Sequence, residues 1–173
     1  MWALDLSVIL LIIVLISIIW PNFRGAPWVP TSFRLVRKML DLAEVGPTDI
    51  VYDLGCGDGR TLVMAAKRYG AKAVGIEIDP LRYVWCQFLI TVLGLRKQVK
   101  ILFGDFFKHD LSEATVITCY LLQDTNQKLE QKFRQELTSG TRLVSNTFTF
   151  LGMPLIKQNS DARLYIYYSS NDI

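Results

Sequence analysis

The sequence of 173 residues predicts an α/β protein with a doubly wound, mostly parallel sheet, preceded by an N-terminal transmembrane helix. Three observations support this prediction. Short apolar segments typical of buried strands alternate along the chain with amphipathic segments typical of helices. A turn with three glycines directly follows the first of these strands. A long apolar stretch without a cation opens the chain.

The opening apolar stretch covers residues 6–20, in which two serines are the only polar residues apart from the final Trp20. A helix over residues 3–23 would be about 31 Å long, close to the hydrocarbon thickness of a bilayer. Trp2 and Trp20 stand at its two ends, where interfacial aromatic residues are expected. No basic segment precedes it, which disfavours the alternative of a cleaved signal peptide. We therefore expect residues 1–23 to form a transmembrane anchor.

The charges on either side of this stretch predict its orientation. Asp5 precedes it, whereas four cations follow at positions 24, 34, 37 and 38. The positive-inside rule therefore predicts a single-pass protein. Its C-terminal domain is expected on the cytoplasmic side of a membrane, or on the equivalent side in an organelle. The lipid bilayer is thus an expected partner.

Residues 24–46 are expected to form a linker and an N-terminal helix. Prolines and a glycine between positions 21 and 30 favour an extended linker. Thr31 or Ser32 can cap the helix that follows, in which apolar residues recur at helical spacing. A plain packing helix is an equally good interpretation of this segment. The remaining domain, residues 47–173, has the size of one folding unit.

The glycine turn runs from Gly55 to Gly59, directly after the predicted strand Ile50–Leu54, which contains Asp53, and before a helix that starts near Thr61. Glycines let the backbone turn sharply and approach a ligand closely. Arg60 occupies the position where a dinucleotide fingerprint needs its third glycine, which argues against NAD. No Gly-Lys-Ser or Gly-Lys-Thr follows, which excludes the phosphate-loop pattern.

Further strands are expected at residues 73–79, 99–103, 115–120 and 141–146, with a closing hairpin over residues 148–168. Helices are expected from Pro80 for about fifteen residues and over residues 125–137. The aromatic residues of the first of these helices, Trp85 and Phe88 among them, are expected in the core. The second strand ends at Glu77, which can accept two hydrogen bonds from a ribose diol.

Composition excludes several function classes. The net charge is only +3 and no block of like charges occurs, so charge does not indicate nucleic-acid binding. The odd count of three cysteines does not fit a disulfide scaffold. A single histidine and the absence of a Cys-x-x-Cys pair indicate no metal site.

Taken together, Asp53-x-Gly-x-Gly-x-Gly, Glu77 at the end of strand two and Asp105 after strand three resemble the class I S-adenosylmethionine-dependent methyltransferases. Pro27 to Ser32 and the apolar stretch before it resemble, more narrowly, the membrane-anchored protein-lysine methyltransferases whose mitochondrial members modify the adenine nucleotide translocase and an ATP synthase subunit. Residues 31–36 are also similar to non-SET histone-lysine methyltransferases. The resemblance covers residues 1 to about 150 and implies a Rossmann-like methyltransferase fold.

The resemblance implies the following site. The methionine part of S-adenosylmethionine would be surrounded by Asp53, Gly55, Cys56, Gly57 and Gly59. The ribose would be held by Glu77 beside Ile78, and the adenine by Asp105 and Phe106. The methyl group and the methionine carboxylate would be covered by Pro30, Thr31 and Ser32. Tyr120 would line the acceptor channel, and Thr31 and Tyr120 are the catalytic candidates. No metal takes part.

The fourth strand departs from these families, because Leu121-Leu122-Gln123 stands where asparagine or proline is usual. This departure affects the acceptor side more than the cofactor side. The resemblance implies N-methylation of lysine in a membrane-associated protein, with S-adenosylhomocysteine as product and without nucleic acid as partner. Two alternatives stay open, a small-molecule or lipid methyltransferase and a non-catalytic S-adenosylmethionine-binding module.

Overall fold

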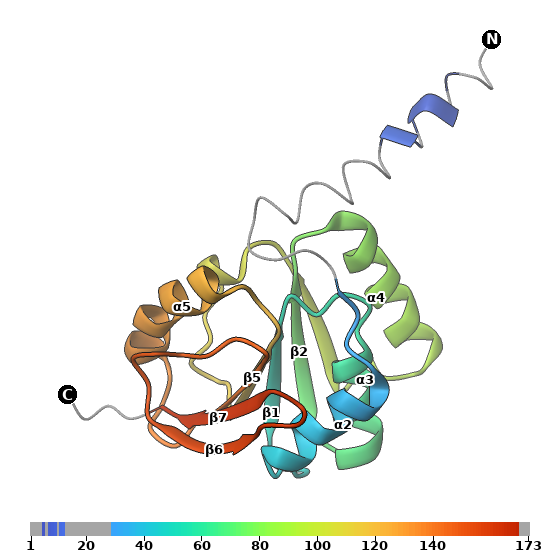
Figure 1. Ribbon diagram of the computed structural model, residues 1–173. Helices are drawn as coiled ribbons and strands as arrows, with labels where there is room; N and C mark the ends of the chain where they lie inside the picture. Colours follow the sequence, from blue (N-terminus) through green and yellow to red (C-terminus); the bar gives the residue numbers. More distant parts are fainter. Residues whose placement is uncertain (1–4, 6, 10, 13–28, 170–173) are drawn as a thin grey trace.

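The computed structural model describes residues 5, 7–9, 11–12 and 29–169, and most of these build a seven-stranded sheet with helices on both faces (Figure 1). The predicted transmembrane helix over residues 1–23 lies largely outside the described residues. Within the described part of the chain, no helix is both long and apolar enough to span a bilayer. The divisions predicted at residues 23 and 46 stay predictions.

In chain order the elements are α2 (Phe33–Leu42), β1 (Ile50–Leu54), α3 (Arg60–Tyr69), β2 (Lys72–Glu77), α4 (Pro80–Val92), β3 (Val99–Phe103), the 3-10 helix η2 (Phe106–Lys108), β4 (Val116–Cys119), α5 (Gln123–Glu136), β5 (Arg142–Asn146), β6 (Leu155–Asn159) and β7 (Leu164–Tyr168). Ser32 caps α2 by accepting from the N–H of Leu35 at 3.2 Å, as expected. The expected strands are confirmed, with ends that shift by at most two residues. The closing hairpin is confirmed over Leu155–Tyr168, so it starts seven residues later than expected.

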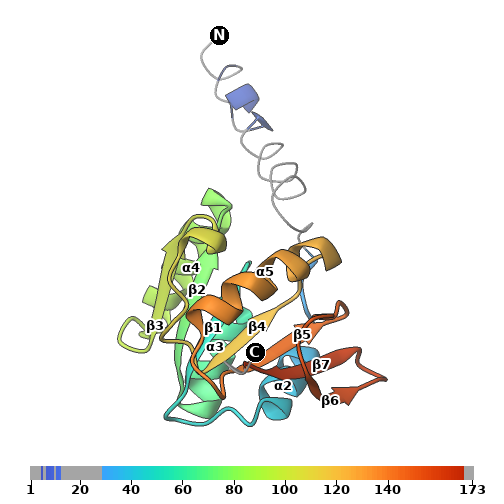
Figure 2. The ribbon, with the colours of Figure 1, turned by 90° about the vertical axis from the view of Figure 1, so that its left-hand side faces the viewer.

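The sheet has the order β3-β2-β1-β4-β5-β7-β6. Strands β1 to β5 pair in parallel, and β7 pairs antiparallel with both β5 and β6. Helices α2, α3 and α4 lie on one face of the sheet and α5 on the other (Figure 1). Each face of the sheet has its own apolar core. Figure 2 looks onto the α5 face, where that helix crosses the middle of the sheet. This arrangement confirms the doubly wound, mostly parallel prediction.

The expected alternation of strands and helices is wrong between β3 and β4. Residues 104–115 form only the short η2 and turns, in which the Asp105 carboxylate accepts from the N–H of Phe107 at 3.0 Å. Phe106, Leu111 and Ala114 are buried against the sheet. A few apolar side chains therefore cover this part of the sheet in place of a helix.

The expected inner face of α4 is also wrong. Cys86 and Ile90 are buried, whereas Trp85 and Phe88 are half exposed, at 50% and 59%. The helix is apolar around most of its circumference, so periodicity alone did not identify the buried face. Packing decides it, because the Cys86 thiol fits beside the glycine turn and donates to the Gly57 carbonyl at 3.1 Å.

The register of the parallel strands brings their carboxyl ends to one edge of the sheet. Leu54 pairs with Ile76 on one side and Cys119 on the other. Cys119 pairs in turn with Ser145. The glycine turn, the end of β2 and the segment after β4 therefore meet at one edge, next to the point where the strand order reverses between β1 and β4.

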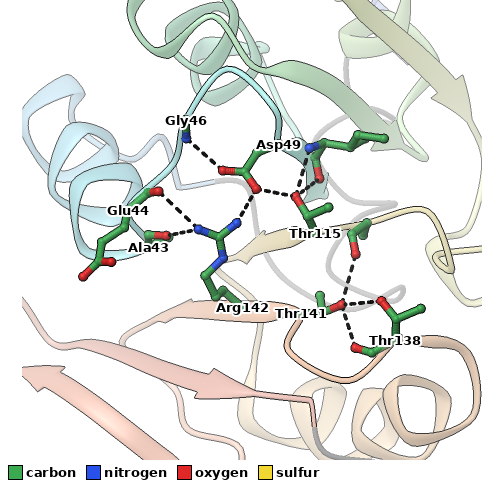
Figure 3. Close-up of polar contacts among 10 residues, drawn as sticks. Ala43, Glu44, Gly46, Asp49, Thr115, Thr138, Thr141 and Arg142 are labelled. Atoms are coloured by element: carbon green, nitrogen blue, oxygen red, sulfur yellow. Dashed lines mark hydrogen bonds and ion pairs between the residues drawn. The ribbon is translucent and has the colours of Figure 1, made fainter.

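The opposite edge of the sheet is held together by Arg142 at the start of β5 (Figure 3). Its guanidinium donates to the carbonyls of Ala43 and Glu44 at 2.8 and 3.2 Å and pairs with the Asp49 carboxylate. Asp49 also accepts from the Thr115 hydroxyl at 2.7 Å. This network joins the end of α2 to the starts of β1, β4 and β5, away from the edge that carries the predicted site.

Candidate active site

Three glycines shape the turn between β1 and α3. Gly55, Gly57 and Gly59 have φ values of +77°, +58° and +80°, which side chains with a Cβ rarely adopt. Gly59 precedes α3 directly and provides no side-chain cap. The backbone of the turn is held in place by its own hydrogen bonds. The N–H groups of Gly55 and Cys56 donate to the Ile76 carbonyl at 2.9 and 3.1 Å, and that of Arg60 donates to the Asp58 carboxylate at 3.3 Å.

Asp53, two residues before the turn, is almost fully buried at 8% exposure. Its carboxylate accepts from the Thr118 hydroxyl on the neighbouring β4 at 2.7 Å. Burial raises the pKa of Asp53 to about 6, although hydrogen bonds from Thr118 and Thr61 act in the opposite direction. Asp53 thus lies beneath the turn and links β1 to β4.

Glu77, at the end of β2, lies beside the turn. Its two carboxylate oxygens accept from the N–H groups of Gly57 and Asp79, at 2.8 and 2.9 Å. Burial raises the pKa of Glu77 even though both hydrogen bonds favour the charged form. The expected end of the second strand at Glu77 is confirmed, and the carboxylate is held in one orientation against the glycine turn. Ile78 follows it and is partly buried.

Arg60, whose position in the motif argues against NAD, also contacts the segment before α2. Its guanidinium forms an ion pair with Asp58, donates to the Thr31 carbonyl, and lies 5.1 Å from the centre of the Phe33 ring. Although burial opposes ionisation, Arg60 lowers the pKa of Asp58 through this pair. Arg60 thereby fastens the segment of Pro30, Thr31 and Ser32 to the glycine turn.

The predicted adenine residues follow β3. The N–H of Gly104 donates to the Glu77 carbonyl at 2.9 Å, which ties this segment to the end of β2. Asp105 is partly exposed and caps η2, while Phe106 is buried with its ring centre 4.9 Å from that of Phe107. Asp105 therefore reaches the edge, and Phe106 belongs mainly to the core.

Cys56 lies between the first two glycines of the turn. The pKa of Cys56 is raised well above its ordinary value, mainly by a hydrogen bond with Cys86 and, to a smaller extent, by burial. Both cysteines are free and buried. Cys56 therefore packs within the turn and is unsuited to act as a thiolate nucleophile.

Tyr120 and Leu121 follow β4 at the same edge. Tyr120 is partly buried, and Leu121 is buried with a methyl group 3.7 Å from where a Cβ would lie on Gly55. The unusual leucine after Tyr120 thus packs directly against the glycine turn. Tyr120 is brought to the site edge by the β1–β4 register.

A polar network on the acceptor side was missed by sequence reasoning. Gln123 exchanges two hydrogen bonds with the backbone of Thr149, at 2.9 and 3.2 Å. The buried Asn126 amide donates to the Ser145 hydroxyl and the Phe148 carbonyl, at 3.1 and 3.2 Å. These contacts hold the loop after β5 against the start of α5. The one sequence feature that pointed to this network is Gln123, which stands where the resembled families usually have asparagine or proline.

Comparison with known proteins agrees with this geometry. Residues 53–157 match the family model of the ANTKMT methyltransferase domain. A protein-lysine N-methyltransferase from Saccharolobus islandicus (strain REY15A) is 46% identical over 127 residues, which cover 73% of this chain and 79% of that protein. The mouse (Mus musculus) adenine nucleotide translocase lysine N-methyltransferase is 31% identical over 157 residues, 85% of this chain and 67% of that protein.

Two further similarities bear on length and fold. A Xenopus laevis lysine N-methyltransferase named for an ATP synthase subunit is 29% identical over 72% of this chain, which corresponds to only 54% of that longer protein. The crystal structure of an RNA methyltransferase from Salinibacter ruber, in complex with S-adenosyl-L-homocysteine, superposes with a TM-score of 0.78 and 38% identity. It covers 84% of this chain and 96% of that one.

Proposed function

This chain belongs to the ANTKMT methyltransferase family, and we propose on that premise that it is an S-adenosylmethionine-dependent methyltransferase that N-methylates lysine side chains of a protein. The observation that supports this most directly is the Glu77 carboxylate, fixed beside the three-glycine turn by two backbone N–H groups. The names of the relatives from Saccharolobus islandicus and mouse support lysine as the acceptor.

The residues at the sheet edge fit S-adenosylmethionine. Each oxygen of Glu77 accepts one backbone N–H, and a carboxylate oxygen has room for a second donor such as a ribose hydroxyl. The three glycines leave no Cβ between the backbone and a ligand. Asp105, which is partly exposed, can accept from the adenine amino group. Pro30, Thr31 and Ser32 would cover the methionine end.

When bound, S-adenosylmethionine supplies a sulfonium-activated methyl group, so the chain needs chiefly to align an in-line displacement. Such alignment can lower a barrier by about 7 to 11 kcal/mol. Thr31, fastened through its carbonyl to Arg60, and Tyr120 after β4 would flank the acceptor channel. A lysine amine must enter neutral, which costs roughly 4.6 kcal/mol at pH 7 from its ordinary pKa. A dry, aromatic channel lowers the pKa of that amine.

The same proposal includes a membrane location. Residues 1–23 would anchor the chain as a single-pass transmembrane helix with the catalytic domain on the cytoplasmic or equivalent side. The apolar sequence of residues 6–20 and the cations that follow it support this. The anchor would hold the site near membrane-associated protein substrates. Deleting residues 1–23 should then reduce modification of a membrane target more than that of a soluble peptide containing the same lysine.

The test is incubation of the detergent-solubilised protein and its native membranes with methyl-labelled S-adenosylmethionine. Label is then separated into protein, lipid and RNA, the last because a similar structure is an RNA methyltransferase. Methyl-lysine in a protein band, lost with Glu77→Gln and kept with the exposed Glu113→Gln at the opposite edge, supports the proposal. Label in RNA or lipid alone would contradict lysine as the acceptor.

A further inference from the structure

Helix α4 exposes an unusually large apolar surface. Its outward side chains, with exposures from 43% to 65%, are Leu81, Val84, Trp85, Phe88 and Val92. At about 3.6 residues per turn, these five positions span about 100° of the helix circumference. A contiguous face of this kind on a soluble surface marks an interaction site.

The exposed charges from Pro80 to Phe103 have one sign. This range contains no acidic residue and four cations, of which Arg82 pairs with the buried Asp79 at the start of α4, while Arg96, Lys97 and Lys100 are exposed. Arg96 and Lys97 follow the end of α4 directly, and both are exposed. An apolar helix face near exposed cations, with the capping Asp79 carboxylate buried, is suited to an anionic bilayer. The headgroups would attract the cations, and the interface would accept the apolar side chains.

The position of α4 in the fold is consistent with contact between its exposed face and a bilayer. The helix begins immediately after Glu77 and Asp79, at the site edge of the sheet (Figure 1), and its inner side contacts the glycine turn through Cys86. Thr31 is held at the same edge by Arg60. The continuous described part of the chain thus starts at Val29, two residues before Thr31.

We propose that α4 lies in the interface of an anionic bilayer, with its five exposed apolar side chains in the boundary between headgroups and acyl chains. This inference rests on the membrane location proposed above, and not on the identity of the methyl acceptor. Bilayer contact through α4 would hold the site edge close to the membrane surface, where lysines that emerge from a membrane protein are within reach.

The test uses the full-length chain with one spin label, reconstituted into vesicles of phosphatidylcholine and phosphatidylglycerol. The label is placed by Val84→Cys on α4 or by Leu151→Cys in the loop after β5, a position that is 72% exposed. The native cysteines are buried and should not react. Flotation measures membrane attachment separately, and collision with oxygen or with a water-soluble nickel complex reports the surroundings of each label.

We expect the label at residue 84 to show a several-fold higher oxygen-to-nickel accessibility ratio than the label at 151, and the difference to shrink in pure phosphatidylcholine. Equal, water-like ratios at both positions on floated vesicles would overturn the inference while leaving the anchor intact. Shielding of residue 84 from both reagents would also overturn it, because a second copy or a folded-back segment would then cover the face. Failure to float would remove the membrane location and the inference together.

Discussion

Asp53 and Glu77 are both buried carboxyl groups at the site, and they differ in the hydrogen bonds that offset the cost of burying their charge. Glu77 accepts two backbone N–H groups, whereas Asp53 is buried beneath the turn with hydroxyl partners on Thr118 and Thr61. Ionised Asp53 is therefore costly to the folded protein, because hydroxyl hydrogen bonds do not offset its desolvation.

Asp53→Asn should reduce the pH dependence of stability. The folded-state pKa of about 6 lies above the ordinary value of 3.8, so the carboxyl contributes stability that is complete below pH 4 and is lost as pH rises through 6. This loss is at most about 3 kcal/mol in the wild type and absent from the variant. Urea unfolding at pH 4 and pH 7 measures the difference. An equal loss in both proteins would contradict the assignment.

Arg60→Lys should weaken cofactor binding. A lysine cannot pair with Asp58 through two nitrogens and also donate to the Thr31 carbonyl, so the segment around Thr31 would detach from the turn. We expect the KM for S-adenosylmethionine to rise roughly tenfold. Arg34→Lys, at an exposed position on α2, is the matched control. A KM that is the same in both variants would show that Arg60 does not position the segment.

The site residues that could be predicted are those with local signals. The glycine turn is read from consecutive residues, and Glu77 from its place at the end of the next strand. Arg60 was missed because its decisive partner, Thr31, lies 29 residues away. The same holds for Gln123 and Thr149, which are 26 residues apart. Long-range partners of polar residues depend on the packing and leave no periodic trace in the sequence.

At the scale of elements, Gly75 determines how closely α3 and the glycine turn pack on β2. A Cβ at this position would lie 2.5 Å from a methyl group of Leu62 and 2.7 Å from the Cys56 sulfur. Gly75→Ala should therefore destabilise the protein by about 1 to 3 kcal/mol through overpacking. Thermal or urea unfolding measures this.

Gly46→Ala is the matched control, because nothing lies within 4 Å of its Cβ position and its φ is not positive. It should be neutral or slightly stabilising, since alanine reduces the freedom of the unfolded chain. Equal stability of the two alanine variants would contradict the close packing described for β2.

The bounds and buried faces of elements were predicted correctly where a segment has a single apolar face. They were predicted wrongly where apolar residues surround the helix or where turn formers predominate. The strand Val99–Phe103 was predicted with its observed bounds. In α4, however, apolar residues surround the helix, and only contact with the glycine turn selects Cys86 for burial. Between β3 and β4 the twelve residues 104–115 are too rich in turn formers for a helix, which the expected alternation had overlooked.

At the scale of the whole molecule, the Arg142 network and the proposed cofactor site lie at opposite edges of the sheet. Arg142→Leu removes the donor to two carbonyls at the end of α2 and leaves the buried Asp49 carboxylate without its cation. We expect a loss of about 2 to 3 kcal/mol in the free energy of unfolding. The affinity for S-adenosylmethionine should be unchanged at a temperature where the variant is folded.

Arg34→Leu, which changes an exposed arginine in the same way, should leave both quantities near their wild-type values. Weaker cofactor binding by folded Arg142→Leu would mean that the two edges are coupled. The doubly wound, mostly parallel sheet was predictable from the alternation of apolar strands with amphipathic helices. The Arg142 network joins residues 93 and 99 positions apart and was not predictable in this way.

The most direct test of the account is calorimetric titration of the protein with S-adenosylhomocysteine. One site per chain is expected, with affinity lowered roughly 10- to 100-fold by Glu77→Gln, because a charge-assisted hydrogen-bond acceptor is lost. Glu113→Gln, at an exposed carboxylate on the other edge, should bind like the wild type. No binding by the wild type, or equal binding by both variants, would contradict a cofactor site at the glycine turn and Glu77.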